Sequence, residues 1–394
     1  MKTPRTALLL LLGGVLPWAS FAQGFSSGST GADGALDVTA DTTLDLPPSG
    51  IFNFTTINVA AGATLRFNRN ALNTPVYLLA TGDITITGTI NVSGANGTAN
   101  PPVGGAGGPG GFDGGMPGFI SVTPGAGYGP GAGRGGGAYN SGVANAGSAS
   151  YAGSATGLGS TNHGALYGSP LLVPILGGSG GGGCAGSPGI GGGGGGGAIL
   201  LASNTRIVLT GSVQATGAAS PGGGGNGSGG AIRLVAPEVS GTGSLNVNGG
   251  NYGSDGGHGR IRIDTIDRRD LRYNFTPLSA ANVGSFMAVF TTPVPRLDIL
   301  SAAGTAIPEG SAAPVFIQLP FGSDPNRTVT VQARGFGAVV PIRVVLTPDS
   351  GDPITYDDQI DNTTVNPAQK TVAITLPLNV RTHVAVWTRR VRNT

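Results

Sequence analysis

Three segments of the chain repeat one alternation of apolar and polar residues. They are residues 84–94 (ITITGTINVSG), 207–217 (IVLTGSVQATG) and 239–249 (VSGTGSLNVNG), and each carries a central Thr-Gly pair. Because successive side chains point to opposite faces of a strand, a period of two predicts strands with one buried and one exposed face. The glycine of each pair predicts a bend or a close backbone approach within the strand.

A second, shorter strand pattern accompanies each copy. The short runs are residues 76–80 (VYLLA), 199–202 (ILLA), 232–236 (IRLVA) and 261–264 (IRID). The last three begin at intervals of about 30 residues, which is typical of solenoid repeats. A single repeat cannot bury its own apolar face, so stacked repeats would form the core. The pattern predicts an all-β protein whose residues 23–267 form a right-handed parallel β-helix, or solenoid.

A long glycine-rich insertion, residues 95–197, separates the first copy from the second. Three interpretations stay open: a flexible loop, a bundle of polyproline-II-like glycine strands packed on the solenoid, or a ligand-binding crest. Aromatic rings can stack on sugars or proteins, but they can equally anchor the segment to the solenoid. The candidate binding residues in the insertion are Tyr128, Tyr139, Tyr151 and Tyr167; Phe112, Phe119 and His163 lie between or beside them.

The segments VYLLATGDITITGTINVSG and GGAIRLVAPEVSGTGSLNVNGG resemble glycine-rich, adhesin-like secreted bacterial β-helix proteins, which are related in architecture to the pectin-lyase-like superfamily. The resemblance covers residues 57–264 apart from the insertion. That superfamily contains both adhesins and polysaccharide lyases, so the resemblance implies a fold more than an activity.

The N-terminus has the parts of a secretory signal peptide. Lys2 and Arg5 supply positive charge, residues 7–15 are apolar, and a small-x-small site ends at Ala22. Residues 1–22 are therefore expected to be cleaved, which predicts a secreted protein or one on the outer cell surface. No later run is long and apolar enough to form a transmembrane helix.

The composition changes in the last hundred residues. Beyond a cap or linker at residues 268–293, residues 294–394 contain seven short strand patterns separated by turn residues. They predict an antiparallel β-sandwich of fibronectin-III or other immunoglobulin-like type. The single cysteine, Cys184, excludes an antibody-type domain with an internal disulfide. The patterns are residues 296–300, 315–319, 328–333, 342–346, 354–356, 371–376 and 383–387.

Composition limits the ligands that the protein is expected to bind. The formal charge of +2 includes Lys2 and Arg5, so the mature chain is about neutral and no nucleic-acid partner is expected. The only lysine outside the signal peptide is Lys370, far from the glycine tracts, so no nucleotide or other cofactor is expected. No metal is expected either, because the acidic residues near the C-terminus lack calcium-loop spacing. These are Asp349, Asp352, Asp357, Asp358 and Asp361.

Polar side chains form three rows on the predicted outer face of the repeats. Such an array could bind carbohydrate or ice. Alternatively, threonine suits strands and Asn or Gln ladders stabilise stacked rungs without any ligand. The rows are Thr87, Thr210 and Thr242; Thr89, Ser212 and Ser244; and Asn91, Gln214 and Asn246.

One cluster of ionisable residues is the candidate catalytic site. Arg262 is expected to lie beside Arg233 on the outer face, where two arginines with flanking acids could hold an anionic sugar. The alternative is a solvated face neutralised by Glu238, Asp264 and Asp267. The complete candidate set is Arg233, Asp255, His258, Arg260, Arg262 and Asp264.

These patterns lead to one expected function and two alternatives. We expect a structural or adhesive protein without catalytic activity, whose partners are extracellular polysaccharide or other surface proteins. The first alternative is a polysaccharide-active β-helix enzyme, either a lyase or a hydrolase. The second is a module that binds carbohydrate or ice through the polar rows.

Overall fold

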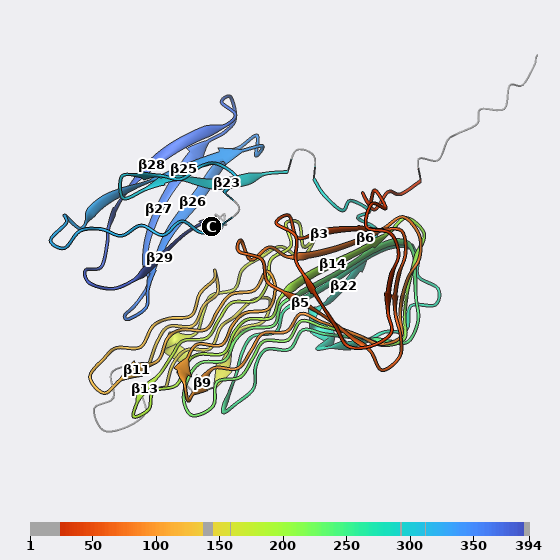
Figure 1. Cartoon of the computed structure of the whole chain (residues 1–394), viewed down its shortest axis with the longest axis horizontal. Coiled ribbons are helices and arrows are strands. Elements are labelled where there is room, and N and C mark those ends of the chain that lie inside the picture. The colour runs from red at the N-terminus through yellow and green to blue at the C-terminus, as the bar shows by residue number, and fades with distance from the viewer. Residues whose placement is uncertain (1–23, 137–144, 158, 292–293, 312, 390–394) are drawn as a thin grey trace, which may run out of the picture.

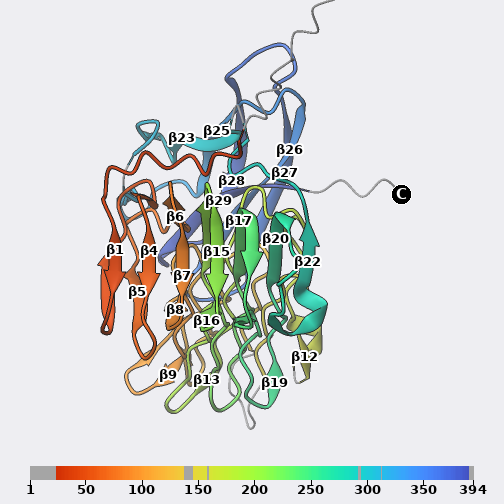
Figure 2. The ribbon, with the colours of Figure 1, turned by 90° about the vertical axis from the view of Figure 1, so that its right-hand side faces the viewer.

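The computed structural model describes residues 24–136, 145–157, 159–291, 294–311 and 313–389. Within these residues, two parallel sheets wind together into a solenoid-like coil (Figures 1 and 2). The ten-stranded sheet contains β1 (Leu36–Val38), β3 (Ile51–Phe54), β4 (Ile57–Val59), β6 (Val76–Ala80), β7 (Ile84–Ile86), β14 (Ala198–Ser203), β15 (Arg206–Leu209), β17 (Ala231–Ser240), β20 (Arg260–Asp267) and β22 (Ala281–Gly284). The six-stranded sheet contains β2 (Thr42–Asp45), β5 (Thr64–Asn68), β8 (Thr89–Asn91), β16 (Ser212–Gln214), β18 (Ser244–Asn246) and β21 (Asn274–Thr276).

The ten-stranded sheet turns a corner of the coil. Strand β17 pairs with β14 through residues 231–235 and with β15 through residues 238–240. One continuous strand thus joins two sides of the coil, and the six-stranded sheet forms a third. The parallel pairing extends past residue 267, the expected end of the solenoid, because β22 lies in the segment predicted as a cap or linker and pairs with β20.

Aliphatic side chains stack in register inside the coil. Ile84, Ile207 and Val239 occupy paired positions on adjacent strands and are fully buried. A second ladder, on the six-stranded sheet, consists of Ile90, Val213 and Leu245. Burying each aliphatic side chain contributes about 1.5–3 kcal/mol, and the ladders account for the apolar alternation in the sequence.

Each predicted long strand is two strands that meet at a corner. In the first copy, β7 ends at Ile86 and β8 begins at Thr89, with Gly88 between them. A Cβ atom at Gly211 would overlap the carbonyl oxygen of Gly88 on the neighbouring rung. One uninterrupted strand over residues 84–94 is therefore wrong, whereas the bend at the glycine is confirmed.

The glycine-rich tracts form a hydrogen-bonded bundle beside the coil (Figure 1). Gly178 and Gly181 donate their N–H groups to the carbonyls of Gly196 and Gly193, at 2.7 and 2.9 Å. The residues between them donate to other tracts, so a tract returns to the same neighbour at every third residue. A period of three is that of the polyproline II helix, which has no internal hydrogen bonds and must bond to its neighbours.

Glycine tracts from outside the insertion complete the same bundle. Gly193 donates to the carbonyl of Gly225, and Gly229 donates to the carbonyl of Gly257. A Cβ atom at Gly181 would overlap the carbonyl oxygen of Gly225. A flexible loop is therefore the wrong description of the insertion where the structure describes it, and the packed bundle is the interpretation that fits.

Two antiparallel sheets form the C-terminal part of the described chain. One has the order β24-β23-β25-β28 and the other β27-β26-β29. Residues 315–319 form no strand, which corrects one prediction, and the short β24 was not predicted. The strands are β23 (Arg296–Ala302), β24 (Thr305–Ala306), β25 (Asn326–Arg334), β26 (Val339–Pro348), β27 (Ile354–Asp361), β28 (Ala368–Thr375) and β29 (Thr382–Thr388).

This C-terminal pair of sheets packs against the glycine bundle. The ring of Trp387 meets the ring of Phe112 edge-on, with centroids 5.5 Å apart. The hydroxyl of Tyr128 donates to Asp349 at 3.1 Å, and the Ser350 hydroxyl donates to the carbonyl of Thr123 at 2.7 Å. The bundle thus contacts both the coil and the C-terminal sheets.

Candidate functional site

Two of the predicted polar rows lie in register on the outer side of the six-stranded sheet. Thr89, Ser212 and Ser244 occupy paired positions on β8, β16 and β18, and Asn91, Gln214 and Asn246 follow in the next row. The hydroxyls of Thr89 and Ser212 are 3.1 Å apart and share a hydrogen bond. Such bonds between rungs support the interpretation of the rows as a stabilising ladder.

The third row is at the corner rather than on a flat sheet. Thr87, Thr210 and Thr242 are exposed and precede the corner glycines. The Thr87 hydroxyl donates to the carbonyl of Val59 at 3.0 Å. The three rows therefore do not form one plane.

The three candidate tyrosines that the structure describes are packed against other parts of the protein rather than lining an open surface. The rings of Tyr151 and Tyr167 stack with centroids 4.4 Å apart, and Tyr151 is fully buried. Burial raises the pKa of Tyr151, whose hydroxyl donates to the carbonyl of Leu176 at 2.9 Å. Tyr128 lies at the contact with the C-terminal sheets, and Tyr139 is outside the described residues.

The candidate catalytic residues separate into two groups. Asp255 is exposed at a loop tip, His258 is partly buried, and the Arg260 guanidinium donates to the carbonyl of Tyr167 at 3.0 Å. Arg233 and Arg262 are neighbours on β17 and β20, as the repeat alignment predicted. The two groups do not converge on one open groove.

The arginine pair is buried, so the prediction of a solvated outer face is wrong. Arg233 is fully buried and Arg262 is 7% exposed, because residues 285–290 cover them. Asp264 bridges the two guanidinium groups, at 3.1 Å from Arg233 Nη2 and 2.6 Å from Arg262 Nη2. Burial lowers the pKa of Arg233, and the Asp264 carboxylate opposes that shift.

The covering segment completes this buried cluster. The Arg233 guanidinium donates to the carbonyls of Phe286 and Ala288 at 3.1 and 2.7 Å. The N–H of Phe286 donates in turn to the Asp264 carboxylate at 2.8 Å. The cluster therefore fastens residues 285–290 to the last coils, and it offers no water-accessible acid or base for catalysis.

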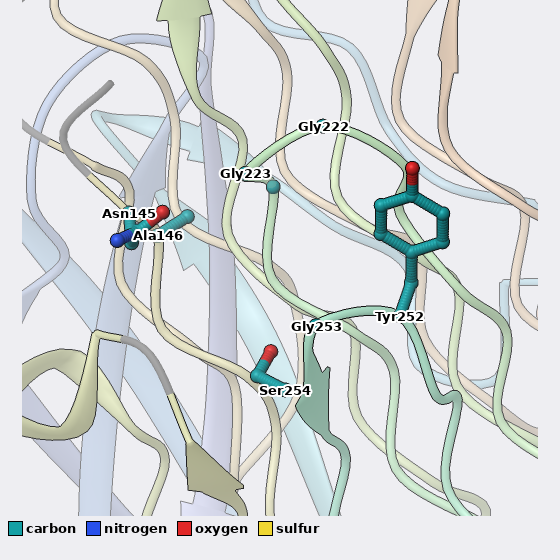
Figure 3. A pocket seen from close by; sticks show the side chains of 8 residues that line it. Asn145, Ala146, Gly222, Gly223, Tyr252, Gly253 and Ser254 are labelled. Carbon is teal, nitrogen blue, oxygen red and sulfur yellow. The ribbon is translucent and has the colours of Figure 1, made fainter. Parts of the chain in front are cut away.

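Three loop tips of the glycine bundle enclose the cavity that we take as the candidate binding site (Figure 3). Its volume is about 310 Å³, the lower end of the range for small-molecule sites. Tyr252 is 54% exposed, and its ring stands at the edge of the cavity. The lining residues are Asn145, Ala146, Gly222, Gly223, Gly224, Tyr252, Gly253 and Ser254.

Sequence reasoning missed Tyr252 as a site residue. It lies in the run NYGSDG after the third repeat copy, outside the insertion that was searched for aromatics. The glycine tract that follows it belongs to the same bundle as the insertion, and this relation is visible only in three dimensions. An aromatic ring flanked by turn residues was the available signal, because such a ring is placed at a loop tip.

Three of the five acidic residues near the C-terminus are paired with bases, and Asp361 accepts a hydrogen bond from the Thr363 hydroxyl. Asp349 bonds to Arg381, Asp357 to Arg343, and Asp358 to Lys370. Among the residues that the structure describes, no group of three or more His, Cys, Asp or Glu is arranged to hold a metal ion. Cys184 is a buried free thiol, and burial raises its pKa.

No protein-family model matches this chain, and neither a curated protein nor a solved structure matches it. In the described part of the chain, we find no helix of the length and apolarity needed to span a membrane.

Proposed function

We propose that this chain is an exported structural or adhesive protein of the cell surface or exterior, without catalytic activity. In this proposal, residues 1–22 are a signal peptide, the solenoid is a scaffold, and residues 294–394 are an immunoglobulin-like sandwich. The likeness to adhesin-like β-helix proteins of the pectin-lyase-like architecture belongs to the same proposal.

The observation that carries the proposal is the hydrogen-bonded glycine bundle. Its tracts bond to one another at every third residue, and the bundle contacts the C-terminal sheets through Phe112 and Trp387. Loops on such a scaffold are fixed in space, which lowers the entropy lost when they bind a partner. Loop tips that are fixed in space suit adhesion, whereas many enzymes need a loop that closes over the substrate.

Attachment of cells tests this proposal. A strain that produces the protein is compared with a deletion strain for retention on polysaccharide-coated surfaces under flow, and protease treatment of intact cells reports exposure of the protein. We expect weaker retention of the deletion strain and digestion of the protein on intact cells. Equal retention, or a protein found only inside the cell, would refute the proposal.

The carbohydrate- or ice-binding alternative keeps one supporting observation. Thr87, Thr210 and Thr242 are exposed along the corner of three successive rungs. The enzyme alternative keeps the fold resemblance but loses its other support, an accessible arginine pair, because Arg233 lies fully buried beneath residues 285–290.

A further inference from the structure

The cavity at the loop tips is built from three tracts that are far apart in the sequence. Residues 145–146, 222–224 and 252–254 meet there, each at the end of a bundle tract (Figure 3). Gly222 and Gly253 have φ values of +80° and +67°, in the region that glycine adopts at least cost. In two of the three walls, the backbone is thus turned by a glycine suited to that turn.

A buried polar layer holds the walls in place behind the cavity. Asn226 is fully buried, and its side-chain amide donates to the carbonyls of Ser254 and Tyr252. Ser148, also fully buried, shares a hydrogen bond of 3.1 Å with the Ser254 hydroxyl. Since these contacts lie within the protein, the cavity has its shape before any ligand enters, and binding need not order the loops.

The lining is mainly apolar and combines one aromatic ring with a few uncharged polar groups. Tyr252 presents a half-exposed ring, while Asn145, Ser254 and glycine backbone supply hydrogen-bonding groups. The apolar C–H face of a pyranose ring can pack on an aromatic ring while its hydroxyls bond to amides and backbone. None of the lining residues is ionisable at neutral pH, so nothing in the wall would neutralise a charged ligand.

Asp255 places a negative charge directly after the lining residue Ser254 in the sequence. Its carboxylate is exposed immediately after Ser254 and accepts a hydrogen bond from the Thr156 hydroxyl at 3.4 Å. A negative charge at this position repels carboxylated or sulfated sugars and leaves neutral sugars unaffected.

We propose that this cavity binds one neutral pyranose unit of an extracellular polysaccharide, with Tyr252 as the stacking platform. The inference deepens the proposed adhesive function and rests on it for the identity of the natural ligand. For a single sugar in a shallow cavity, the expected dissociation constant is on the order of 1 mM.

Ligand-observed saturation-transfer NMR tests the inference on the full mature chain. The probes are methyl glycosides of glucose, galactose, mannose and N-acetylglucosamine, with glucuronic acid as the anionic comparison. We expect transfer to the ring protons of at least one neutral glycoside and little to glucuronic acid. The Tyr252→Ala variant should bind about fivefold or more weakly, and Tyr252→Trp should retain binding.

Phe119→Ala is the matched control, because Phe119 is an aromatic residue 60% exposed on another loop and does not line the cavity. It should bind as the unaltered protein does. Absence of transfer to every neutral glycoside, equal binding by Tyr252→Ala, or preference for glucuronic acid would each overturn the inference. Cell retention measured in parallel separates the two proposals: retention that survives Tyr252→Ala leaves the adhesive role intact while this site fails.

Discussion

Arg233 and Asp264 form an ion pair whose two side chains are both completely buried, with Nη2 and Oδ2 3.1 Å apart. Arg262 shares the same carboxylate, so two cations and one anion lie together beneath residues 285–290. A group of this kind is costly to desolvate and is stable only while each charge keeps its partners. The stability of the last coils therefore depends on residues 285–290 staying in place over the pair.

Removing the shared carboxylate should destabilise the protein strongly. Asp264→Ala leaves Arg233 and Arg262 close together without a counter-charge, and loss of one partner of a buried pair typically costs about 3–5 kcal/mol. Urea unfolding followed by circular dichroism measures the loss. Asp267→Ala is the control, because Arg269 in the Asp267–Arg269 pair is 86% exposed, so water can solvate it when the carboxylate is removed. Equal effects of the two variants would contradict this account of the cluster.

The parts of the fold that could be predicted from the sequence are the strands in which apolar and polar residues alternate. The pairing of Ile84 with Ile207 and of Arg233 with Arg262 follows from aligning the repeats. The burial of the arginines does not, because the segment that covers them has no periodic relation to β17. A bend at Gly88 could be predicted from the sequence, but the angle between β7 and β8 depends on contacts with neighbouring rungs.

The glycine bundle and the cavity were harder to predict for a related reason. A glycine tract has no side-chain pattern, so its hydrogen-bond partners cannot be inferred from composition. The prediction that the tyrosines bind a ligand treated the insertion as a surface, whereas the fully buried ring of Tyr151 lies inside it. Tyr252 is recognisable as a site residue only in three dimensions, where residues 145–146, 222–224 and 252–254 meet.

The close packing of the bundle predicts that alanine is poorly tolerated there. In Gly181→Ala, the new methyl group would overlap the carbonyl oxygen of Gly225, and the two tracts must move apart. Overpacking of this kind costs about 1–3 kcal/mol, which thermal unfolding can detect. Gly24→Ala is the control, since no atom lies within 4 Å of the added Cβ. A similar stability of the two variants would show that the bundle is looser than described.

His163 should make stability depend on pH below neutrality. The N–H of Ser148 donates to Nδ1 of His163 at 3.0 Å, which requires that this nitrogen be unprotonated. Burial lowers the pKa of His163 in the folded protein, so below about 6.5 the unfolded chain binds the proton first. Stability is therefore full above that pH and is lost as the pH falls from there towards the lower folded pKa.

Unfolding midpoints between pH 8 and pH 5 measure this dependence. His163→Gln is the comparison, because glutamine can accept the same hydrogen bond but does not titrate. The midpoint of the unaltered protein should fall relative to that of the variant below about pH 6.5. Parallel curves would show that His163 is not the group responsible.

Trp387 should report whether the C-terminal sheets stay docked on the bundle. The chain has two tryptophans, and the other, Trp18, lies in the predicted signal peptide, so fluorescence of the mature protein would come from Trp387. Its ring meets Phe112 edge-on at 5.5 Å, a contact worth about 0.5–1.5 kcal/mol beyond its buried area. Phe112→Ala should shift the Trp387 emission to longer wavelength and increase quenching by acrylamide, because water replaces the lost ring.

Phe119→Ala is the control for this measurement. It removes an exposed phenylalanine elsewhere in the insertion and should leave the spectrum unchanged. Unchanged emission in Phe112→Ala would mean that other contacts hold the sheets, such as those of Tyr128 with Asp349 and of Ser350 with Thr123, and that the Phe112–Trp387 pair contributes little to docking.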